Sequence, residues 1–182
     1  LGIKTILLAP TGRAAKVLSQ YTSEKALTIH KRIYREQTNA QYESKFSLNL
    51  NREVDALFIV DEASMISSGS GEADIFGSGD LLNDLVEYVR SGKECRLMLV
   101  GDDAQLPPVG SDISPALDPI SLSHYGDVEY ATMDEVVRQS NDSGILFNAT
   151  MIRCMLENRI YEIPHFESSF PDFKSINGGE LL

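Results

Sequence analysis

The chain has 182 residues, the size of one domain, and 42% of them are hydrophobic, which is enough for a single packed core and excludes a disordered tail. The net charge is −11, and no apolar run approaches the roughly 18 to 20 residues that cross a bilayer. No charged-then-apolar signal segment opens the sequence either. We therefore expect a cytoplasmic protein that has no membrane partner.

The charge is unevenly distributed along the sequence. Residues 1–35 contain seven basic side chains and one acidic side chain, a balance of +6, whereas the rest of the chain contains 9 basic and 26 acidic side chains, a balance of −17. A basic segment on an acidic body is typical of a protein that touches a phosphate backbone along a confined track. An ordinary solvated helix face is the alternative explanation.

Apolar runs alternate with helical patterns along the chain, which indicates a parallel α/β sheet. Three runs are nearly continuous in aliphatic residues, as strands covered on both faces are, at residues 5–9, 56–60 and 96–101. Helices are predicted at residues 13–21, 29–35 and 81–90, and from Asp142 or Ser143 through Leu156. Residues 67–79 are rich in serine and glycine and are expected to form a flexible surface loop.

Two cysteines, Cys95 and Cys154, are too few for a disulfide framework and lack metal-ligand spacing. We expect both to be reduced residues in or near the core. Residues 158–182 contain two prolines and a Gly-Gly pair, which indicates a loosely held tail or the start of a linker.

Polar loops that contain glycine follow the first and third predicted strands. Ligands of an open parallel sheet bind outside the carboxyl ends of its strands, so these loops are candidate sites. The first loop, Pro10-Thr11-Gly12-Arg13, offers a capping hydroxyl and unpaired backbone N–H groups to a phosphate, with Arg13 as a charged clamp. A plain threonine cap is the alternative for Thr11.

An acid pair, Asp61-Glu62, directly follows the second predicted strand and has the form of a Walker B element. In such an element the strand lifts Asp61 towards a hydrated magnesium ion and places Glu62 where it can take a proton from water. Two acids in this position are costly unless a cation or a water network uses them. The pair therefore predicts nucleotide hydrolysis.

The third loop and a later arginine are weaker candidates. Gln105 can both donate to a terminal phosphate and accept from the attacking water. Asp102 and Asp103 could simply cap the turn, and for Asp103 we favour that role. Arg138 could stabilise charge on a transferring phosphoryl group as an arginine finger does, although a lone arginine is usually a surface residue.

No phosphate-binding Gly-x-x-x-x-Gly-Lys-Ser/Thr loop occurs in the sequence. Gly92-Lys93 is followed by Glu94 instead of a hydroxyl residue, and Gly2-Ile3-Lys4-Thr5 leads into a strand, whereas a P-loop opens a helix. Half of a nucleotide-hydrolysing site is thus present in the sequence without the phosphate cradle.

Taken in order, five segments resemble the motifs of superfamily 1B helicases, and within that family the RecD-like proteins such as the alpha subunit of exodeoxyribonuclease V. Residues 9–16 look like motif Ia, 28–31 like the short Thr-Ile-His element, 59–65 like motif II, 101–110 like motif III and 137–139 like motif IV. The resemblance spans residues 3–152. Its most specific part is Gln-Leu-Pro-Pro-Val-Gly after Gly-Asp.

The resemblance implies a three-layer, RecA-like P-loop NTPase fold truncated at the N-terminus, with ATP and Mg²⁺ as cofactors. It also implies single-stranded DNA and further subunits of a helicase–nuclease complex as partners. Asp61 would hold magnesium through water, Glu62 would be the general base, and Gln105 and Arg138 would face the γ-phosphate. The residues that would contact single-stranded DNA are Pro10, Thr11, Gly12, Arg13, Thr28, His30 and Lys31.

We therefore expect residues 1–157 to form a partial motor domain, and residues 158–182 to be a tail or the start of a linker to a second one. The predicted function is that of a fragment of an ATP-dependent DNA helicase of repair or recombination, inactive by itself. A P-loop ATPase of another kind and a non-catalytic binding module are the alternatives. No carboxylate and lysine cluster supports exonuclease activity.

Overall fold

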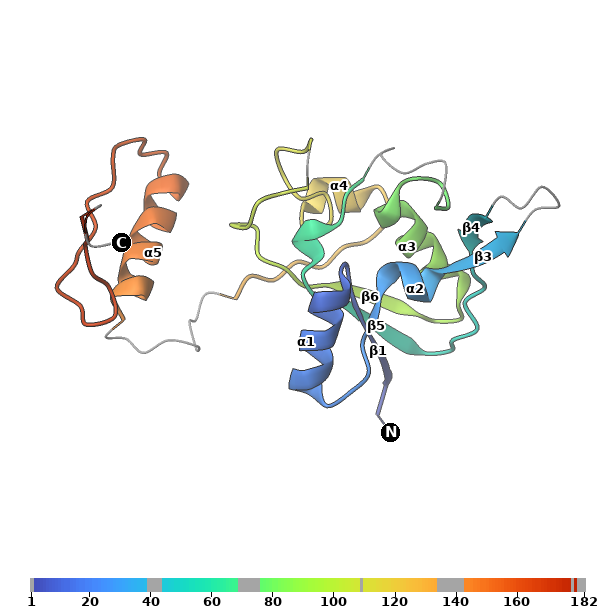
Figure 1. The fold of residues 1–182 in the computed structure, drawn as a ribbon. Helices are drawn as coiled ribbons and strands as arrows, with labels where there is room; N and C mark the ends of the chain where they lie inside the picture. The colour runs from blue at the N-terminus through green and yellow to red at the C-terminus, as the bar shows by residue number, and fades with distance from the viewer. Residues whose placement is uncertain are drawn as a thin grey trace. The chain divides into compact units, whose positions relative to one another are not determined.

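The computed structural model describes residues 2–38, 44–68, 76–108, 110–133, 143–177 and 179. Contacts divide the chain into two compact units, Leu1–Tyr130 and Ala131–Leu182 (Figure 1). The first contains the sheet, and the second contains one long helix and the segment after it. Each unit is described by itself below.

A parallel four-stranded sheet in the order β2-β1-β5-β6 forms the centre of the first unit (Figure 1). Its strands are β1 (Lys4–Ala9), β2 (Leu27–Thr28), β5 (Ala56–Val60) and β6 (Arg96–Leu99). The register aligns Leu8 with Val60, and Val60 with Leu99. The predicted parallel α/β sheet is confirmed, and the short strand β2 is an addition to it.

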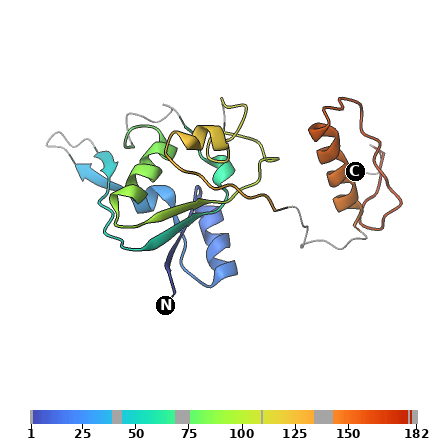
Figure 2. The same ribbon diagram turned by 180° about the vertical axis from the view of Figure 1, so that it is seen from behind.

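Helices flank this sheet on both faces (Figures 1 and 2). They are α1 (Gly12–Thr22), α2 (Ile29–Ile33), α3 (Leu81–Ser91) and the short α4 (Pro119–Ser123). Because successive side chains of a strand point to opposite faces, Ala9 packs with α1 while Leu8 joins the larger core of α2 and α3. Phe58 is fully buried in that core, edge-on to Tyr88. Each such buried side chain contributes about 1.5–3 kcal/mol.

Strand β6 is less covered than its sequence indicates. Leu97 and Leu99 pack against the larger core, but Met98 between them is 47% exposed. The expectation that this strand is covered on both faces is therefore wrong. Its position at the end of the sheet explains the difference, since an edge strand has one neighbouring strand instead of two.

An antiparallel hairpin of β3 (Tyr34–Thr38) and β4 (Ser44–Leu48) follows α2 directly. The helix predicted at residues 29–35 therefore ends early, at Ile33. Tyr34 explains this ending, because its buried side chain donates a hydrogen bond to Asp84 Oδ2 at 2.6 Å and packs against the Phe76 ring. These contacts hold Tyr34 in an extended conformation, φ −105° and ψ 152°.

The end of the predicted surface loop at residues 67–79 is firmly packed. Phe76 stacks on Phe46 of β4 with ring centroids 4.6 Å apart. Gly77 has φ +49°, and a Cβ added there would lie 1.9 Å from the Asp84 carboxylate. The backbone N–H of Ser78 donates to the same carboxylate at 3.0 Å. Residues 76–79 are thus a loop held by specific contacts, and the predicted flexibility stays a prediction; residues 69–75 lie outside the described part.

The second unit is organised by α5 (Gly144–Glu157), which begins after the predicted cap Ser143. Asn148 bonds the backbone of Glu167, and the Asp172 carboxylate accepts from Ser143 Oγ at 2.6 Å and from Gly144 N at 2.7 Å. The sequence suggested a loosely held segment after residue 157, whereas these bonds attach its middle to α5. The assignment of domains in the complete protein stays a prediction.

Both cysteines are free, as expected. Cys95 is half-buried against the larger core, but Cys154 is exposed on α5, so the prediction of a near-core position is wrong for Cys154. Within the residues described, no helix is both long enough and apolar enough to cross a membrane.

Candidate functional site

The carboxyl ends of the parallel strands bring most of the predicted site residues to one edge of the sheet. Thr11 follows β1, Thr28 ends β2, Asp61 follows β5 and Gly101 follows β6. Backbone bonds fix these ends side by side, because Asp61 N donates to the Leu8 carbonyl at 3.0 Å and Val100 N donates to the Val60 carbonyl at 2.8 Å. The predicted convergence of the strand-end loops is present in the fold.

The acid pair forms a strained turn at this edge. Asp61 Oδ1 accepts a hydrogen bond of 3.0 Å from the backbone N–H of Glu62. Glu62 itself adopts φ 57° and ψ 36°, a left-handed conformation that costs a non-glycine residue about 1–2 kcal/mol. Both side chains are half-buried, and among the described residues no group bonds or pairs with the Glu62 carboxylate. Strain and an unpaired acid in one place are typical of functional sites.

The loop after β6 lies directly against this acid turn. Ala63, in the short helix η1 (Ala63–Met65), donates its backbone N–H to the Val100 carbonyl at 2.9 Å. A Cβ on Gly101 would lie 2.9 Å from Ser64 N and 3.0 Å from Leu117 Cδ1. Glycine is therefore needed at position 101 for the backbones of the two loops to approach each other.

Asp102 determines the local shape of the third loop. Its carboxylate accepts from Ala104 N at 3.0 Å, and its carbonyl accepts from Gln105 N at 3.2 Å. The capping role that the sequence suggested for Asp103 thus belongs to Asp102. Gln105 is exposed and so can meet a ligand.

Two threonine hydroxyls begin the helices at this edge. Thr11 Oγ1 accepts from Ala14 N at 3.2 Å to cap α1, and Thr28 Oγ1 accepts from Lys31 N at 3.2 Å to cap α2. The structural reading of Thr11 as a cap is therefore correct. It does not exclude a ligand, because a hydroxyl that accepts one bond still has its own hydrogen to donate.

His30 lies in an aromatic cluster. Its ring is 5.1 Å from that of Phe76, edge to face, and 5.5 Å from that of Tyr34. The Thr-Ile-His element is thereby packed against the segment that precedes α3. Lys31, the next residue, is exposed.

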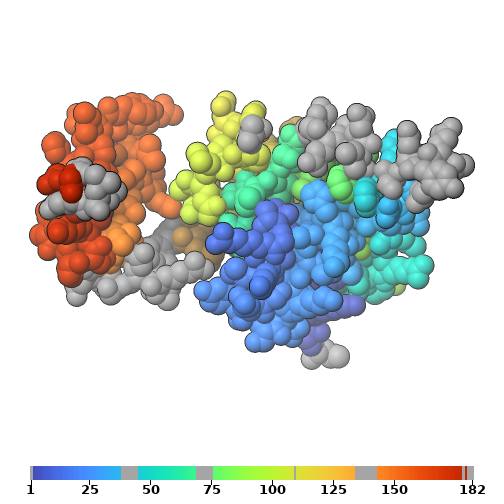
Figure 3. Space-filling view, in the orientation of Figure 1, coloured from blue at the N-terminus to red at the C-terminus, as the bar shows by residue number. Residues whose placement is uncertain are grey.

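The basic segment at residues 1–35 divides into two groups. Lys4 and Arg32 both pair with Glu53, at 2.5 Å and 2.6 Å, near the amino ends of the strands. The other five basic residues are exposed and form no ion pair with a described residue: Arg13, Lys16, Lys25, Lys31 and Arg35. Figure 3 shows residues of this segment, in blue, covering a continuous area of one face of the first unit.

The Glu53 cluster is the charged group that the sequence analysis missed. The hydrogen bond from Lys4 is the main cause that holds the pKa of Glu53 below its ordinary value, Arg32 adds to it, and burial opposes both. The three residues are far apart in sequence, so no local pattern signals the cluster. Only the chain path between α2 and β5 brings them together.

Arg138 falls within residues 134–142, outside the described part of the chain, so its predicted position near the phosphates stays a prediction. Among the described residues, no group of three or more His, Cys, Asp or Glu side chains gathers as a metal site. Asp61 is compatible with a hydrated magnesium ion, because among described residues its carboxylate bonds only to Glu62 N, through Oδ1.

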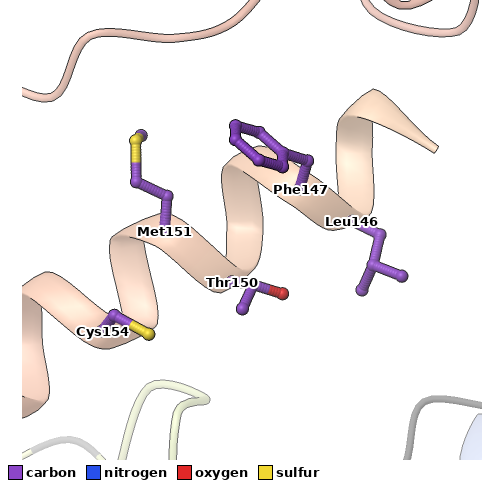
Figure 4. A pocket seen from close by; sticks show the side chains of 5 residues that line it. All are labelled: Leu146, Phe147, Thr150, Met151 and Cys154. Carbon is purple, nitrogen blue, oxygen red and sulfur yellow. The ribbon is translucent and has the colours of Figure 1, made fainter. Parts of the chain in front are cut away.

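The second unit has an apolar pocket on α5 (Figure 4). It is lined by Leu146, Phe147, Thr150, Met151 and Cys154. All five side chains come from a single helix, so the pocket is an open apolar face. It contains none of the predicted site residues.

Comparison with known proteins finds a family match over the part of the chain that contains this edge. A family model described as an AAA domain matches residues 2–111, which include both threonine caps, the acid pair and Gln105. Over 113 residues the chain is 34% identical to the ATP-dependent RecD2 DNA helicase of Deinococcus radiodurans. That match covers 62% of this chain but 13% of the helicase, so the chain spans a small part of its relative's length.

These matches support the predicted resemblance to RecD-like proteins at the level of the family. They do not address kinship with the alpha subunit of exodeoxyribonuclease V in particular. The family model covers more than half of the chain, including all four strands of the parallel sheet and the loop after β6. The chain therefore belongs to the AAA domain family.

Proposed function

We propose that this chain is part of an ATP-dependent DNA helicase and that its carboxyl edge supplies the hydrolytic half of the ATPase site. The observation that carries the proposal is the acid pair. Two half-buried acidic residues follow a buried strand, and no lysine, arginine or histidine among the described residues forms an ion pair with either of them. A resting protein gains nothing from such an arrangement, since desolvating an unpaired acid is unfavourable. A charged ligand that arrives during function accounts for it.

Within this proposal the two acids have different tasks. Asp61 is fixed by its bond from Glu62 N, and its remaining oxygen can accept from the water shell of Mg²⁺, which neutralises phosphate charge when bound. Glu62 accepts the proton of the attacking water. Its left-handed backbone sets the direction of its side chain independently of the strand that precedes it.

Gln105 is proposed to sense the terminal phosphate, because its exposed amide can donate to phosphate and accept from water. Arg138 is proposed to stabilise the charge that builds on the transferring group. The Gly101 contact places the loop of Gln105 against the acid turn, which supports a shared ligand for these groups.

Single-stranded DNA is proposed to bind along Pro10, Thr11, Gly12, Arg13, Thr28, His30 and Lys31. The cap hydroxyls can donate to phosphate oxygens, and the exposed basic residues supply the positive charge that a phosphate backbone requires. The RecD2 match supports DNA as the partner. Repair or recombination, and further subunits of a helicase–nuclease complex, are what the RecD-like resemblance implies.

The phosphate cradle must come from outside these 182 residues, since no P-loop sequence occurs in them. We therefore expect the purified chain to show no ATP hydrolysis that DNA stimulates. A steady-state phosphate-release assay with and without oligo-dT measures this. Clear turnover by the purified chain would contradict the proposed division of the site.

The decisive experiment uses the complete protein that carries this chain. Single-stranded DNA should stimulate its ATP hydrolysis, and Glu62→Gln should lower kcat by about 100-fold or more, the usual contribution of a general base. Binding of a fluorescent ATP analogue should persist in this variant. Glu94→Gln is the matched control, because Glu94 is also a glutamate with positive φ (55°) but is exposed and lies before β6, and the kcat of this variant should be unchanged. A Glu62→Gln enzyme with normal kcat would remove Glu62 from this role.

A further inference from the structure

Ser64 carries a buried hydroxyl that has no explained role in the fold. The residue is 1% exposed, and its Oγ has no hydrogen-bond partner among the described residues. A buried polar group without a partner costs about 1–3 kcal/mol, and most buried hydroxyls are paired for that reason. An alanine would fill nearly the same volume without this cost.

The position of Ser64 distinguishes it from an ordinary packing residue. It lies two residues after Glu62, in η1, and is preceded by the fully buried Ala63 and followed by the exposed Met65 and the fully buried Ile66. Its backbone nitrogen is the atom closest to the site of an added Cβ on Gly101. Ser64 is therefore at the contact between the acid turn and the loop that carries Gln105.

The two loops share few bonds in this state. Among the described residues, the backbone hydrogen bond that joins the acid turn to this loop runs from Ala63 N to the carbonyl of Val100, the residue before Gly101. Within residues 101–105, Asp102 accepts from the backbone N–H groups of Ala104 and Gln105, and most of the loop is exposed. A loop with few anchors can shift when a ligand binds at its tip, and a hydroxyl that both donates and accepts can bond either an N–H or a carbonyl of the shifted backbone.

We propose that Ser64 is a positioning residue, whose hydroxyl bonds the backbone of residues 101–105 when nucleotide is bound and so aligns Gln105 with Glu62. The inference rests on the proposed ATPase function and adds the link between its phosphate sensor and its base. The cost of the unpaired hydroxyl in the free state is recovered when the bond forms. Nucleotide binding thereby favours the aligned arrangement.

Ser47 provides a matched control. Its hydroxyl is also buried without a described partner, but it lies in β4 of the hairpin, opposite Arg35 and away from the acid turn. If every unpaired hydroxyl were merely a packing defect, Ser64→Ala and Ser47→Ala would behave alike.

The test compares Ser64→Ala and Ser47→Ala in the complete protein by thermal unfolding and by DNA-stimulated ATP hydrolysis. Both variants should have an equal or higher Tm, because each loses an unpaired buried group. Only Ser64→Ala should lose kcat, by about 10-fold, which is the effect of one lost hydrogen bond of about 1.4 kcal/mol in the transition state. Its KM for ATP should change little.

Two outcomes overturn the inference while leaving the proposed function intact. Normal kcat in Ser64→Ala shows that the hydroxyl aligns nothing. A lower Tm with a proportionate loss of active protein shows that the hydroxyl is a structural bond of the resting fold. A wild-type protein without DNA-stimulated hydrolysis is a separate result, because it refutes the proposed function and the inference with it.

Discussion

One glutamate lies near the amino ends of the sheet strands and another at their carboxyl ends, and the first is paired with basic residues while the second is not. Near the amino edge Glu53 is 17% exposed and bonds Lys4 and Arg32, with the Arg32 guanidinium 5.9 Å above the Phe58 ring. At the carboxyl edge Glu62 is half-buried, strained and unpaired among the described residues. The first glutamate stabilises the folded state through its ion pairs, and the second has no such pairs and lies where we propose that a ligand binds.

The contrast separates two reasons for placing an acid in a fold. A paired carboxylate stabilises the protein and lowers its own pKa, as Glu53 does. An unpaired carboxylate in a left-handed turn costs free energy that only binding or chemistry can offset. Removing each acid should therefore change different measurements, and the predictions below test that separation from the largest expected effect on folding to the smallest.

Glu53→Gln should lower the free energy of unfolding by about 1–2 kcal/mol, because two charge-assisted hydrogen bonds are lost or weakened and Arg32 stays partly buried. Urea denaturation of the chain measures the change. Asp55→Asn is the control, since Asp55 and Arg96 form an exposed pair at 3.2 Å that should contribute almost nothing. Equal costs for the two variants would show that the Glu53 cluster is no more than a surface ion pair.

Acid should remove the same stabilisation. The folded-state pKa of Glu53 lies below its ordinary value of 4.5, so its contribution is complete above that value and is lost as the pH falls through the lowered folded pKa. Wild type and Glu53→Gln should therefore differ at pH 7 and converge as the pH falls below 4.5. A difference that stays constant through acid titration would contradict a role for the Glu53 charge.

Glu62→Gly should raise the free energy of unfolding by about 0.5 kcal/mol, although it removes the proposed base. Glycine adopts the left-handed conformation without strain, and its greater freedom in the unfolded chain offsets part of that gain. Glu94→Gly tests the same relief at φ 55° away from the site. A destabilised Glu62→Gly beside a stabilised Glu94→Gly would mean that the Glu62 side chain supports the resting fold.

Lys4→Ala should have the smallest effect, a loss of about 0.3 kcal/mol in the free energy of unfolding, and added salt should reduce it further. Lys4 is the main cause of the lowered Glu53 pKa, yet its side chain is 61% exposed, so solvent screens much of its attraction. Arg32 is 25% exposed, and Arg32→Ala should therefore cost more. A larger loss of stability in Lys4→Ala than in Arg32→Ala would show that the exposed Lys4–Glu53 pair stabilises the fold more than the partly buried Arg32–Glu53 pair does.

Much of the sheet could be predicted from sequence because its strands are signalled locally. Residues 56–60 were predicted with the bounds that β5 has, and the helices at 13–21 and 81–90 differ from α1 and α3 by one residue at each affected end. Continuous aliphatic runs and capping residues carry that information. The location of the site followed from the rule that parallel strands end at one edge.

The hairpin was missed because its pattern depends on partners far away in the sequence. Residues 34–38 are mostly polar and continue a helical pattern, and only the buried bond from Tyr34 to Asp84, fifty positions later, favours a strand there. The same limit applied to Glu53, whereas the choice between Asp102 and Asp103 depended on the exact backbone geometry of a local turn. Each depends on which atoms the folded backbone brings within bonding distance.

Two motif glycines should differ in how many substitutions they accept. A Cβ on Gly12 would meet nothing within 4 Å, so this position is open to alanine or serine in a mutational scan. A Cβ on Gly101 would meet backbone atoms of the acid turn, and backbone atoms cannot move aside as the end of a side chain can. In a library selected for growth that depends on this protein, position 101 should stay glycine while position 12 varies. Substitutions should therefore be restricted most at Gly101, where the loop after β6 contacts the acid turn.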